Sequence, residues 1–379
     1  MGKYIHQSEQ WPHFSWDKEI VLERMSMVNK ASGLLIGRLN SIGFDTRLLA
    51  NAETLSIDIV SSSEIEGIAL NDSLVRSSIA RKLGLPSKDD ITPSHYIEGI
   101  VEMMLDAVAN YRQPLNDERL FGWHNCLFPT GMSGFSRIDV AQYRTNEMKV
   151  VSGNFGREKV HYEAIPAADV VKEMKIFFDW FNSDTRPNYL KSAISHFWFV
   201  CIHPFDDGNG RIGRAIADMA LSQADDSTFR FFSMSRQINK EKKAYYDILE
   251  RVSRRSDCDI TEWLLWYLDC MTRAINSSNE VLSCILQKTA FWQNHTNLSF
   301  SERQNKVLNM YFDGYKGKLT TKNWAKHCKI STDTAARDIK DLVEKGVLEP
   351  QKGRVRDVYY GIRCDENTLL VPMPDENME

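Results

Sequence analysis

Apolar residues recur at intervals of three and four along most of this chain, whereas alternating strand-like patterns are few before residue 290. Residues at that spacing share one face of an α-helix, so the pattern predicts a mainly helical, all-α protein. Two of these helical stripes lie close together: Leu190, Ile194, Phe197 and Cys201, then Ile212, Ala215, Ile216, Met219 and Ala220. The polar segment between the two stripes is therefore predicted to be a loop held by a helix on either side.

Other segments also carry structural predictions. The pattern from about Lys18 to Ser41 predicts an N-terminal helix. A second helix is expected to end near Gly67, where a left-handed residue commonly terminates a helix, and one stripe of it holds Leu55, Ile59, Ser62 and Glu66. A hairpin is expected between residues 130 and 166, from β-like stretches amid glycines at Phe135–Ser136, Gln142–Arg144 and Lys159–Tyr162.

The pattern changes from about Ser299. Amphipathic helices are expected to start near Ser301, Leu319 and Ser331, and two β-like stretches then flank the basic segment Lys352–Arg354. Three helices followed by a basic hairpin resemble a winged helix-turn-helix. Residues 301–363 contain fourteen Lys or Arg against eight Asp or Glu, an excess that is compatible with phosphate contacts. We expect this region to bind either DNA or protein.

Composition limits the function classes. The 379 residues are 42% hydrophobic and 26% charged, which is ordinary for a folded soluble protein. A net charge of −4 argues against nucleic-acid or membrane binding by the chain as a whole. No apolar run approaches a membrane span and no apolar signal core begins the chain, so a cytoplasmic protein is expected. The seven cysteines lack CxxC spacing, which disfavours disulfides and structural zinc.

The loop and the start of its second helix, residues 203–214, combine groups suited to phosphate chemistry. His203 can accept a proton from a hydroxyl near neutral pH. Asp207 is a hard oxygen ligand that suits Mg²⁺. The backbone N–H groups at Gly208–Gly210 lie where a helix begins and attract anions. Arg211 and Arg214 lie three residues apart and can fork onto phosphate oxygens, while Phe205 is expected to anchor the loop.

A plain turn is the alternative for Asp-Gly-Asn-Gly alone, because each residue tolerates left-handed backbone. The histidine and both arginines at fixed offsets disfavour that interpretation. A calcium loop is excluded because the alternating oxygen ligands and the terminal Glu are absent.

Residues 203–214 match the signature of Fic (filamentation induced by cAMP) domains, His-x-Phe-x-(Asp/Glu)-Gly-Asn-Gly-Arg-x-x-Arg, at every specified position. The resemblance implies an all-helical enzyme with a small β-hairpin flap that moves AMP from ATP onto a protein Ser, Thr or Tyr hydroxyl. It also implies that His203 is the general base and that Asp207 holds Mg²⁺ or Mn²⁺. Asp207 stands where the Doc-type kinases of the superfamily have Lys, which favours nucleotidyl transfer.

The resemblance assigns further residues to the nucleotide. Gly208–Gly210 would form the anion hole and Arg214 would grip the γ-phosphate, and a tyrosine would line the adenine pocket. The full nucleotide-binding set is Phe205, Asp207, Gly208, Asn209, Gly210, Arg211, Gly213, Arg214, Tyr245 and Tyr246. Helix-face core packing is expected for one of the two tyrosines.

Ser62–Gly67 matches the inhibitory motif of Fic proteins, (Ser/Thr)-x-x-x-Glu-(Gly/Asn). By resemblance, Ser62 and Glu66 are inhibitory residues, and Glu66 pairs with Arg214 in the space of the γ-phosphate. A capping box from Ser63 to Glu66, which would open a new helix, is the alternative.

The predicted domains are an N-terminal helical domain over residues 1–52, a Fic core over 53–290 with the inhibitory helix near 53–67, and a winged helix with a tail over 291–379. By resemblance, the flap near Val160–Tyr162 would bind a target protein by strand addition. His161 is expected to be a surface contact. Self-modification, a homodimer and DNA binding through residues 301–363 are further partner expectations. The alternative functions are transfer of another nucleotide, removal of AMP, and a nucleotide-sensing DNA-binding regulator.

Overall fold

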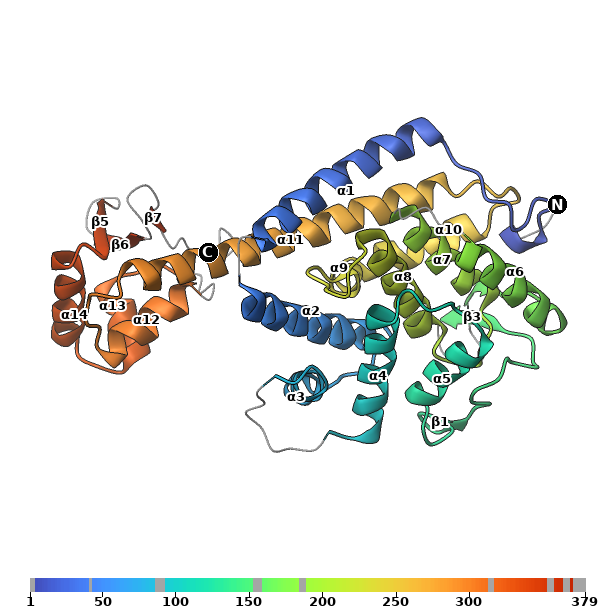
Figure 1. Cartoon of the computed structure of the whole chain (residues 1–379), viewed down its shortest axis with the longest axis horizontal. Helices are drawn as coiled ribbons and strands as arrows, with labels where there is room; N and C mark the ends of the chain where they lie inside the picture. Colours follow the sequence, from blue (N-terminus) through green and yellow to red (C-terminus); the bar gives the residue numbers. More distant parts are fainter. Residues whose placement is uncertain are drawn as a thin grey trace. The chain divides into compact units, whose positions relative to one another are not determined.

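Helices make up most of the fold (Figure 1). The computed structural model describes residues 4–40, 43–85, 93–152, 159–183, 189–312, 317–352, 358–363 and 369–370. Two compact units divide the chain at residues 278 and 279, within one long helix. The predicted boundaries after residues 52 and 290 fall inside helices α2 and α11, and the division into three domains stays a prediction.

The first unit contains helices α1 to α10, the start of α11 and two small hairpins. Its elements are η1 (Ile5–Gln7), α1 (Lys18–Leu39), α2 (Phe44–Ile65), α3 (Asp72–Lys82), α4 (His95–Ala109), α5 (Asp117–Leu127), β1 (Met132–Ser133), β2 (Ser136–Arg137), β3 (Lys149–Ser152), β4 (Lys159–Glu163), η2 (Ala167–Asp169), α6 (Val170–Ser183), α7 (Tyr189–Ile202), α8 (Asn209–Asp225), α9 (Met234–Lys240), α10 (Lys242–Ser253) and α11 (Thr261–Asn294).

Helices α7 and α8 form the centre of this unit. They are buried on nearly all sides because α6 covers α7, while α2, α4 and α5 pack against α8. A helix that is buried all round is typical of a protein core. The two helical stripes on either side of residues 203–208 are therefore confirmed, and the loop between α7 and α8 is held at both ends as predicted.

Helix α2 ends as the sequence pattern indicates. It stops at Ile65, and Gly67 follows with a left-handed φ of +78°. The capping-box alternative is wrong: Ser63 lies inside α2, and the next helix begins at Asp72 under an N-cap from Asn71. Gly67 supplies the left-handed conformation that ends the helix at no steric cost.

The hairpin prediction is confirmed in part. β3 and β4 pair antiparallel, with Val150 opposite Tyr162, and a small second hairpin joins β1 and β2. The expectation that Gln142–Arg144 is β-like is wrong, because these residues lie outside any strand. Arg144 is buried, and its side chain donates hydrogen bonds to main-chain carbonyls. The conformation of this stretch is therefore set by these side-chain bonds and not by pairing with a neighbouring strand.

The second unit is the predicted winged helix. Its elements are α12 (Glu302–Phe312), α13 (Thr321–Cys328), α14 (Thr332–Glu344), β5 (Leu348–Lys352), β6 (Val358–Arg363) and β7 (Leu369–Leu370). β5 pairs antiparallel with β6, and β7 adds to β6. Its own core gathers Val307, Leu308, Trp324, Leu342 and Ile362. The segment between β5 and β6, with Gly353 and Arg354, lies outside the described residues.

Among the helices of the described ranges, none combines the length and apolar character needed to cross a membrane.

Candidate active site

The motif loop folds over a single anchor. Phe205 is fully buried, and its ring stacks on that of His124 at a centroid distance of 4.2 Å. Asn209 fixes the same residue, since its Oδ1 accepts from Phe205 N at 2.9 Å and its Nδ2 donates to Phe205 O at 2.7 Å. Phe205 thus anchors the loop as expected, but it lies beneath the site and does not line the cavity.

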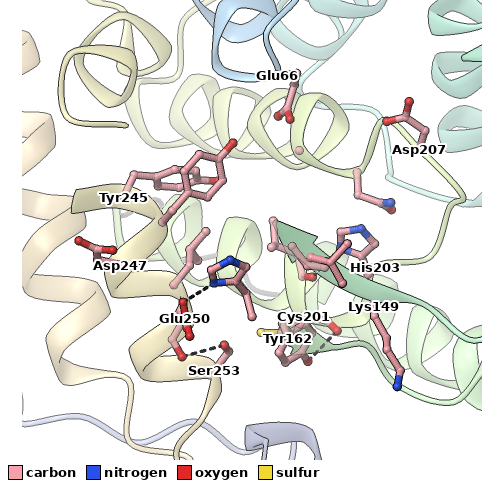
Figure 2. Close-up of a pocket in the computed structure, with 18 of the residues that line it drawn as sticks. Glu66, Lys149, Tyr162, Cys201, His203, Asp207, Tyr245, Asp247, Glu250 and Ser253 are labelled. Carbon is pink, nitrogen blue, oxygen red and sulfur yellow. Dashed lines mark hydrogen bonds and ion pairs between the residues drawn. The ribbon is translucent and has the colours of Figure 1, made fainter. Parts of the chain in front are cut away.

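A cavity of about 590 Å³ lies above this loop. Its wall is formed by the end of α2, the flap β3–β4, the motif loop and α10. Figure 2 shows Glu66, His203 and Tyr245 around the same open space. The volume is typical of small-molecule sites, which span roughly 300–1,000 Å³. The predicted residues that line it are His203, Asp207, Gly208, Asn209, Gly210, Tyr245, Tyr246 and Glu66.

His203 has an unusual backbone and a fixed tautomer. Its φ is +53°, in the left-handed region. Its Nδ1 lies 3.2 Å from the Val200 carbonyl, which can only accept a hydrogen bond, so Nδ1 carries the proton and the lone pair is left on Nε2. Burial lowers the pKa of His203 to about 4. The imidazole is consequently neutral at neutral pH, the form that a general base requires.

The start of α8 meets the cavity. Gly208 is its N-cap with a φ of +84°, and a Cβ there would come within 2.9 Å of the Phe128 ring. Gly208 N donates to Asp207 Oδ1 at 2.5 Å, so one donor of the predicted anion cradle already holds a carboxylate. The N–H groups of the following first turn lack intrahelical acceptors and lie at the positive end of the helix dipole.

Asp207 is the one motif carboxylate with several fixed contacts. It accepts from the Ser133 hydroxyl and from Gly208 N, and Arg211 Nη2 lies 3.6 Å from its Oδ1. Its side chain remains 41% exposed at the cavity. Within the described ranges, no group of three or more His, Cys, Asp or Glu is placed to hold a metal ion. A single carboxylate nevertheless fits Mg²⁺, which takes one or two carboxylates together with waters and substrate phosphates.

Arg214 is bound to the end of α2. Its Nη2 donates to Glu66 Oε1 at 2.7 Å and to Ser62 O at 2.8 Å, and its Nε donates to Ser62 Oγ at 2.8 Å. Burial alone would lower the pKa of Arg214, but the Glu66 carboxylate together with Tyr245 and Tyr246 raises it above its usual value. The structure therefore brings together Ser62, Glu66 and Arg214, as expected from the two motifs.

Glu66 also reaches the start of α8. A Cβ built on Gly210 would overlap Glu66 Oε1, so only the absence of a side chain at Gly210 lets the carboxylate approach the helix there. Arg214 Nη1 is buried and has no hydrogen-bond partner in the described part of the chain. The site thus combines an unused buried donor with a carboxylate that lies where an anion would bind.

Arg211 does not converge with Arg214 as a phosphate fork. Its Nη1 donates to the Tyr96 hydroxyl on α4 at 3.0 Å, and its guanidinium lies 5.0 Å from the Phe128 ring centroid. Arg211, Gly213 and Arg214 lie behind the cavity wall. Gly213 packs on α7, because a Cβ there would come within 3.3 Å of the Phe199 ring. Arg211 positions Asp207 through the ion pair at 3.6 Å.

The two tyrosines of α10 differ. Tyr245 is buried, and its hydroxyl lies 2.8 Å from His196 Nε2, so core packing holds for this member of the pair although its ring still borders the cavity. Tyr246 is 42% exposed and donates to Ile65 O at the end of α2. Burial raises the pKa of Tyr246 to about 12, so both hydroxyls stay protonated near neutral pH.

The flap side of the cavity differs from the expectation. His161 is half-buried and its Nδ1 lies 2.5 Å from Glu250 Oε2, so it is part of the cavity wall and not a plain surface contact. Tyr162 is buried, and its hydroxyl donates a hydrogen bond to Cys201 O (Figure 2). Its side chain therefore packs inside the protein and is not exposed on the flap.

Three contributing residues were missed by sequence reasoning. His124 lies under the loop with Nε2 3.1 Å from Asp207 O, and Arg144 bonds His203 O. No spacing or motif connects either residue to the loop. Asp58 ties α2 to the start of α9 by accepting from Ser233 Oγ at 2.5 Å and from Ser235 N at 3.1 Å. Asp58 precedes Ser62 and Glu66 by four and eight residues, so the helical stripe could have revealed it.

Comparisons with known proteins show which families this chain resembles. Residues 114–221 match the model of the Fic/DOC family, residues 4–85 match a domain of unknown function (DUF4172), and residues 313–358 match the DeoR-like helix-turn-helix domain. Protein adenylyltransferase Fic of Nematostella vectensis is 24% identical over 228 residues, which cover 58% of this chain and 47% of the relative. Protein adenylyltransferase fic-1 of Caenorhabditis elegans is 28% identical over 90 residues, which cover 23% of this chain and 16% of the relative.

The chain therefore spans less than half the length of these curated relatives. A solved structure of a Fic family protein from Desulfovibrio desulfuricans G20 has the same fold with a TM-score of 0.52 and 19% identity, and the match covers 92% of this chain and 97% of that one. The motif at 203–214 lies inside the matched family region. This chain thus contains a Fic domain of the Fic/DOC family, together with a C-terminal DeoR-like winged helix-turn-helix.

Proposed function

We propose that the cavity binds ATP and transfers AMP to a Ser, Thr or Tyr hydroxyl of a target protein, and that Glu66 restrains this reaction. The observation that carries the proposal is the geometry of one site: a neutral His203, the start of α8, and Arg214 held by Glu66 border or support the same cavity. The names of the two curated relatives support adenylyl transfer as the chemistry.

The proposed reaction uses these groups in fixed roles. The target hydroxyl oxygen attacks the α-phosphorus of ATP while the bond from this phosphorus to the bridging oxygen of the β-phosphate breaks, and pyrophosphate leaves. His203 Nε2 takes the hydroxyl proton, since Nδ1 already donates to Val200 O. The N–H groups at the start of α8 would hold the phosphate oxygens.

A divalent cation belongs to this proposal. Asp207 would hold Mg²⁺ or Mn²⁺ with its half-exposed carboxylate, and Arg211, which lies 3.6 Å away, would keep that carboxylate in place. The ion would neutralise charge on the phosphates when bound.

Glu66 competes with the triphosphate in this scheme. Its carboxylate contacts Arg214 and lies against Gly210, so an incoming phosphate would meet a like charge and would have to displace it. Removal of Glu66 would leave Arg214, with its unused Nη1, available to a phosphate oxygen. Misplacement of a reacting group by about 1 Å can cost about 10²-fold in rate, so a displaced triphosphate is enough to restrain transfer.

The proposal is tested by incubating the Glu66→Gly variant and a cell lysate with ATP, GTP, CTP or UTP, each labelled at the α-phosphate. We expect protein labelling from ATP that disappears in the Glu66→Gly/His203→Ala double variant. Labelling from another nucleotide would replace the ATP assignment. An unlabelled lysate with all four nucleotides, or release of AMP from a premodified target, would overturn the proposed direction of transfer.

For the second unit we propose DNA binding through α14. The acidic Asp338 is turned inward, where it pairs with Arg303 at 2.9 Å, and Asp341 pairs with Lys345 at 2.6 Å. The exposed side of α14 keeps Arg337 and Lys340, with Asp333 as an exposed acidic neighbour and Glu344 3.7 Å from the Lys340 amine. A mobility shift with random duplex DNA at low salt tests this proposal, and no shift would favour a protein-binding module.

A further inference from the structure

The end of helix α7, which leads into His203, is capped by residues from outside the motif. Four successive carbonyls accept hydrogen bonds there. The Tyr162 hydroxyl donates to Cys201 O at 2.9 Å. The Arg144 guanidinium donates to Ile202 O at 3.5 Å and to His203 O at 2.8 Å, and the Arg144 backbone N–H donates to Pro204 O at 2.9 Å. Arg144 therefore donates hydrogen bonds to the carbonyl of His203 and to the carbonyls of the residues directly before and after it.

The same guanidinium holds both ends of the flap. Arg144 Nη1 donates to Asn146 O at 2.8 Å, just before β3, and Nη2 donates to Ile165 O at 2.5 Å, just after β4. The residue is 2% exposed, and its side-chain acceptors in the described part of the chain are main-chain carbonyls. One buried cation thus links the base of the flap to the backbone of His203.

We propose that Arg144 is a positioning residue for the transfer reaction: it fixes the left-handed backbone of His203 and couples the flap, where the target is expected to dock, to the orientation of that base. The proposal rests on the proposed function, because it assigns to His203 the role of general base. Arg144 itself does not line the cavity; it acts through the His203 and Ile202 carbonyls.

Two physical arguments support this role. A non-glycine residue with a φ of +53° persists only where its surroundings hold it, and the direct bond from Arg144 Nε to His203 O supplies such a restraint. The planar guanidinium offers five donors in a rigid fork, so it can serve carbonyls from four separate positions at once. A lysine at this position would keep the charge but could not reproduce that geometry.

The charge of Arg144 also acts on His203. Burial is the main cause that lowers the pKa of His203, and the Arg144 cation lowers it further, whereas the Glu66 and Asp207 carboxylates act in the opposite direction. Loss of the cation should therefore raise the pKa of the base. A purely structural role in folding would not change this titration.

The test uses Arg144→Met and Arg144→Lys in the Glu66→Gly background. The matched control is Arg119→Met, because Arg119 also binds main-chain carbonyls, those of Asp106, Asn110 and Gln113, but does not contact the motif loop. We expect kcat to fall by about 10²-fold in Arg144→Met, as for a displaced catalytic group, and less in Arg144→Lys. ATP affinity should stay close to that of the parent, and the acid limb of kcat/KM should move to higher pH.

Arg119→Met should lower the melting temperature without changing kcat or the pH dependence of kcat/KM. Equal kcat in Arg144→Met and its parent, or an equal loss in Arg119→Met, would overturn the proposal.

The pKa of His203 is measured separately by NMR with labelled histidine, using His203→Gln to assign the signal. A raised pKa in Arg144→Met supports the coupling even if no nucleotide is transferred, and an unchanged pKa contradicts it. The absence of transfer in the Glu66→Gly parent would instead reject the proposed function.

Discussion

Basic side chains around the Fic motif are buried, whereas basic side chains of the winged helix are exposed. At the motif, Arg144, Arg211 and Arg214 are 2–3% exposed, and each is bonded to named partners. In the winged helix, the side chain of Lys340 is 78% exposed and that of Arg303 is 45% exposed. A buried charge is costly unless its partners are fixed, whereas a surface pair is worth about 0–1 kcal/mol. The buried arginines therefore fix one geometry of the site, and this geometry points to one kind of ligand. The exposed charges of the winged helix fix no such geometry, so they are compatible with more than one function.

The largest expected effect is at the buried site. His203→Ala in the Glu66→Gly background should reduce AMP transfer by about 10²–10⁴-fold, because it removes the group that takes the proton. ATP binding should persist, since the base acts on the target hydroxyl and not on the phosphates. The rate is measured by label incorporation and the affinity by calorimetry.

His95→Ala is the matched control, because His95 is exposed at the start of α4 and does not line the cavity. It should keep most of the activity. An equal loss from both histidines, or loss of ATP binding with His203→Ala alone, would contradict the assigned role.

Acid should destabilise the first unit through its buried histidines. Burial lowers the pKa of His6, His124 and His203 to about 4 and that of His196 to about 3. The unfolded chain binds protons near pH 6.5, so between that pH and about 4 it binds more protons than the folded chain. The free energy of unfolding should therefore fall as the pH falls through this window, by up to about 1.4 kcal/mol per pH unit for each histidine.

Chemical unfolding at pH 7, 6 and 5 measures this slope. A His196→Gln variant should show a shallower slope than the wild type, because one of the four protonation sites is lost. Unfolding free energies that do not change between pH 7 and 5 would show that these imidazoles are not buried in solution.

The surface charges of α14 should give a smaller effect. If the winged helix binds DNA, Arg337→Glu or Lys340→Glu should weaken binding and reduce the slope of log affinity against log salt by about 0.9 for each lost phosphate contact. Lys175→Glu is the control, because it makes the same charge change on an exposed lysine of α6 in the other unit. Equal weakening by all three variants would indicate general electrostatic attraction and not a surface on α14.

The smallest expected change concerns the pH profile. With its pKa lowered to about 4, His203 is neutral in the free enzyme, so kcat/KM should stay level from about pH 8 down to about pH 5 and fall only below it. An ordinary histidine would halve the rate near pH 6.5. An acid limb centred near pH 6.5 would show that His203 is more solvated than in this structure, or that another group is the base.

The same contrast explains what the sequence could predict. The loop between α7 and α8 and the left-handed Gly67 followed from helical stripes and helix-end preferences, whereas the meeting of Glu66 with Arg214 was implied by the resemblance to the Fic motifs. The role of Arg144 could not be predicted, because the carbonyls that accept its hydrogen bonds lie in three separate segments with no sequence pattern. The separate directions of Arg211 and Arg214 depend on which neighbouring helix packs beside each, which spacing alone does not determine.

The central claim is that Glu66 restrains the site through Arg214, and the most direct test measures AMP incorporation and melting temperature together for Glu66→Gly. Glu64→Gly is the control, because it also removes a carboxylate near the end of α2. The Glu64 carboxylate accepts a hydrogen bond from Asn239 and does not contact Arg214. The account predicts a faster reaction for Glu66→Gly alone. An unchanged or slower rate with a lower melting temperature, or an equal gain from Glu64→Gly, would contradict it.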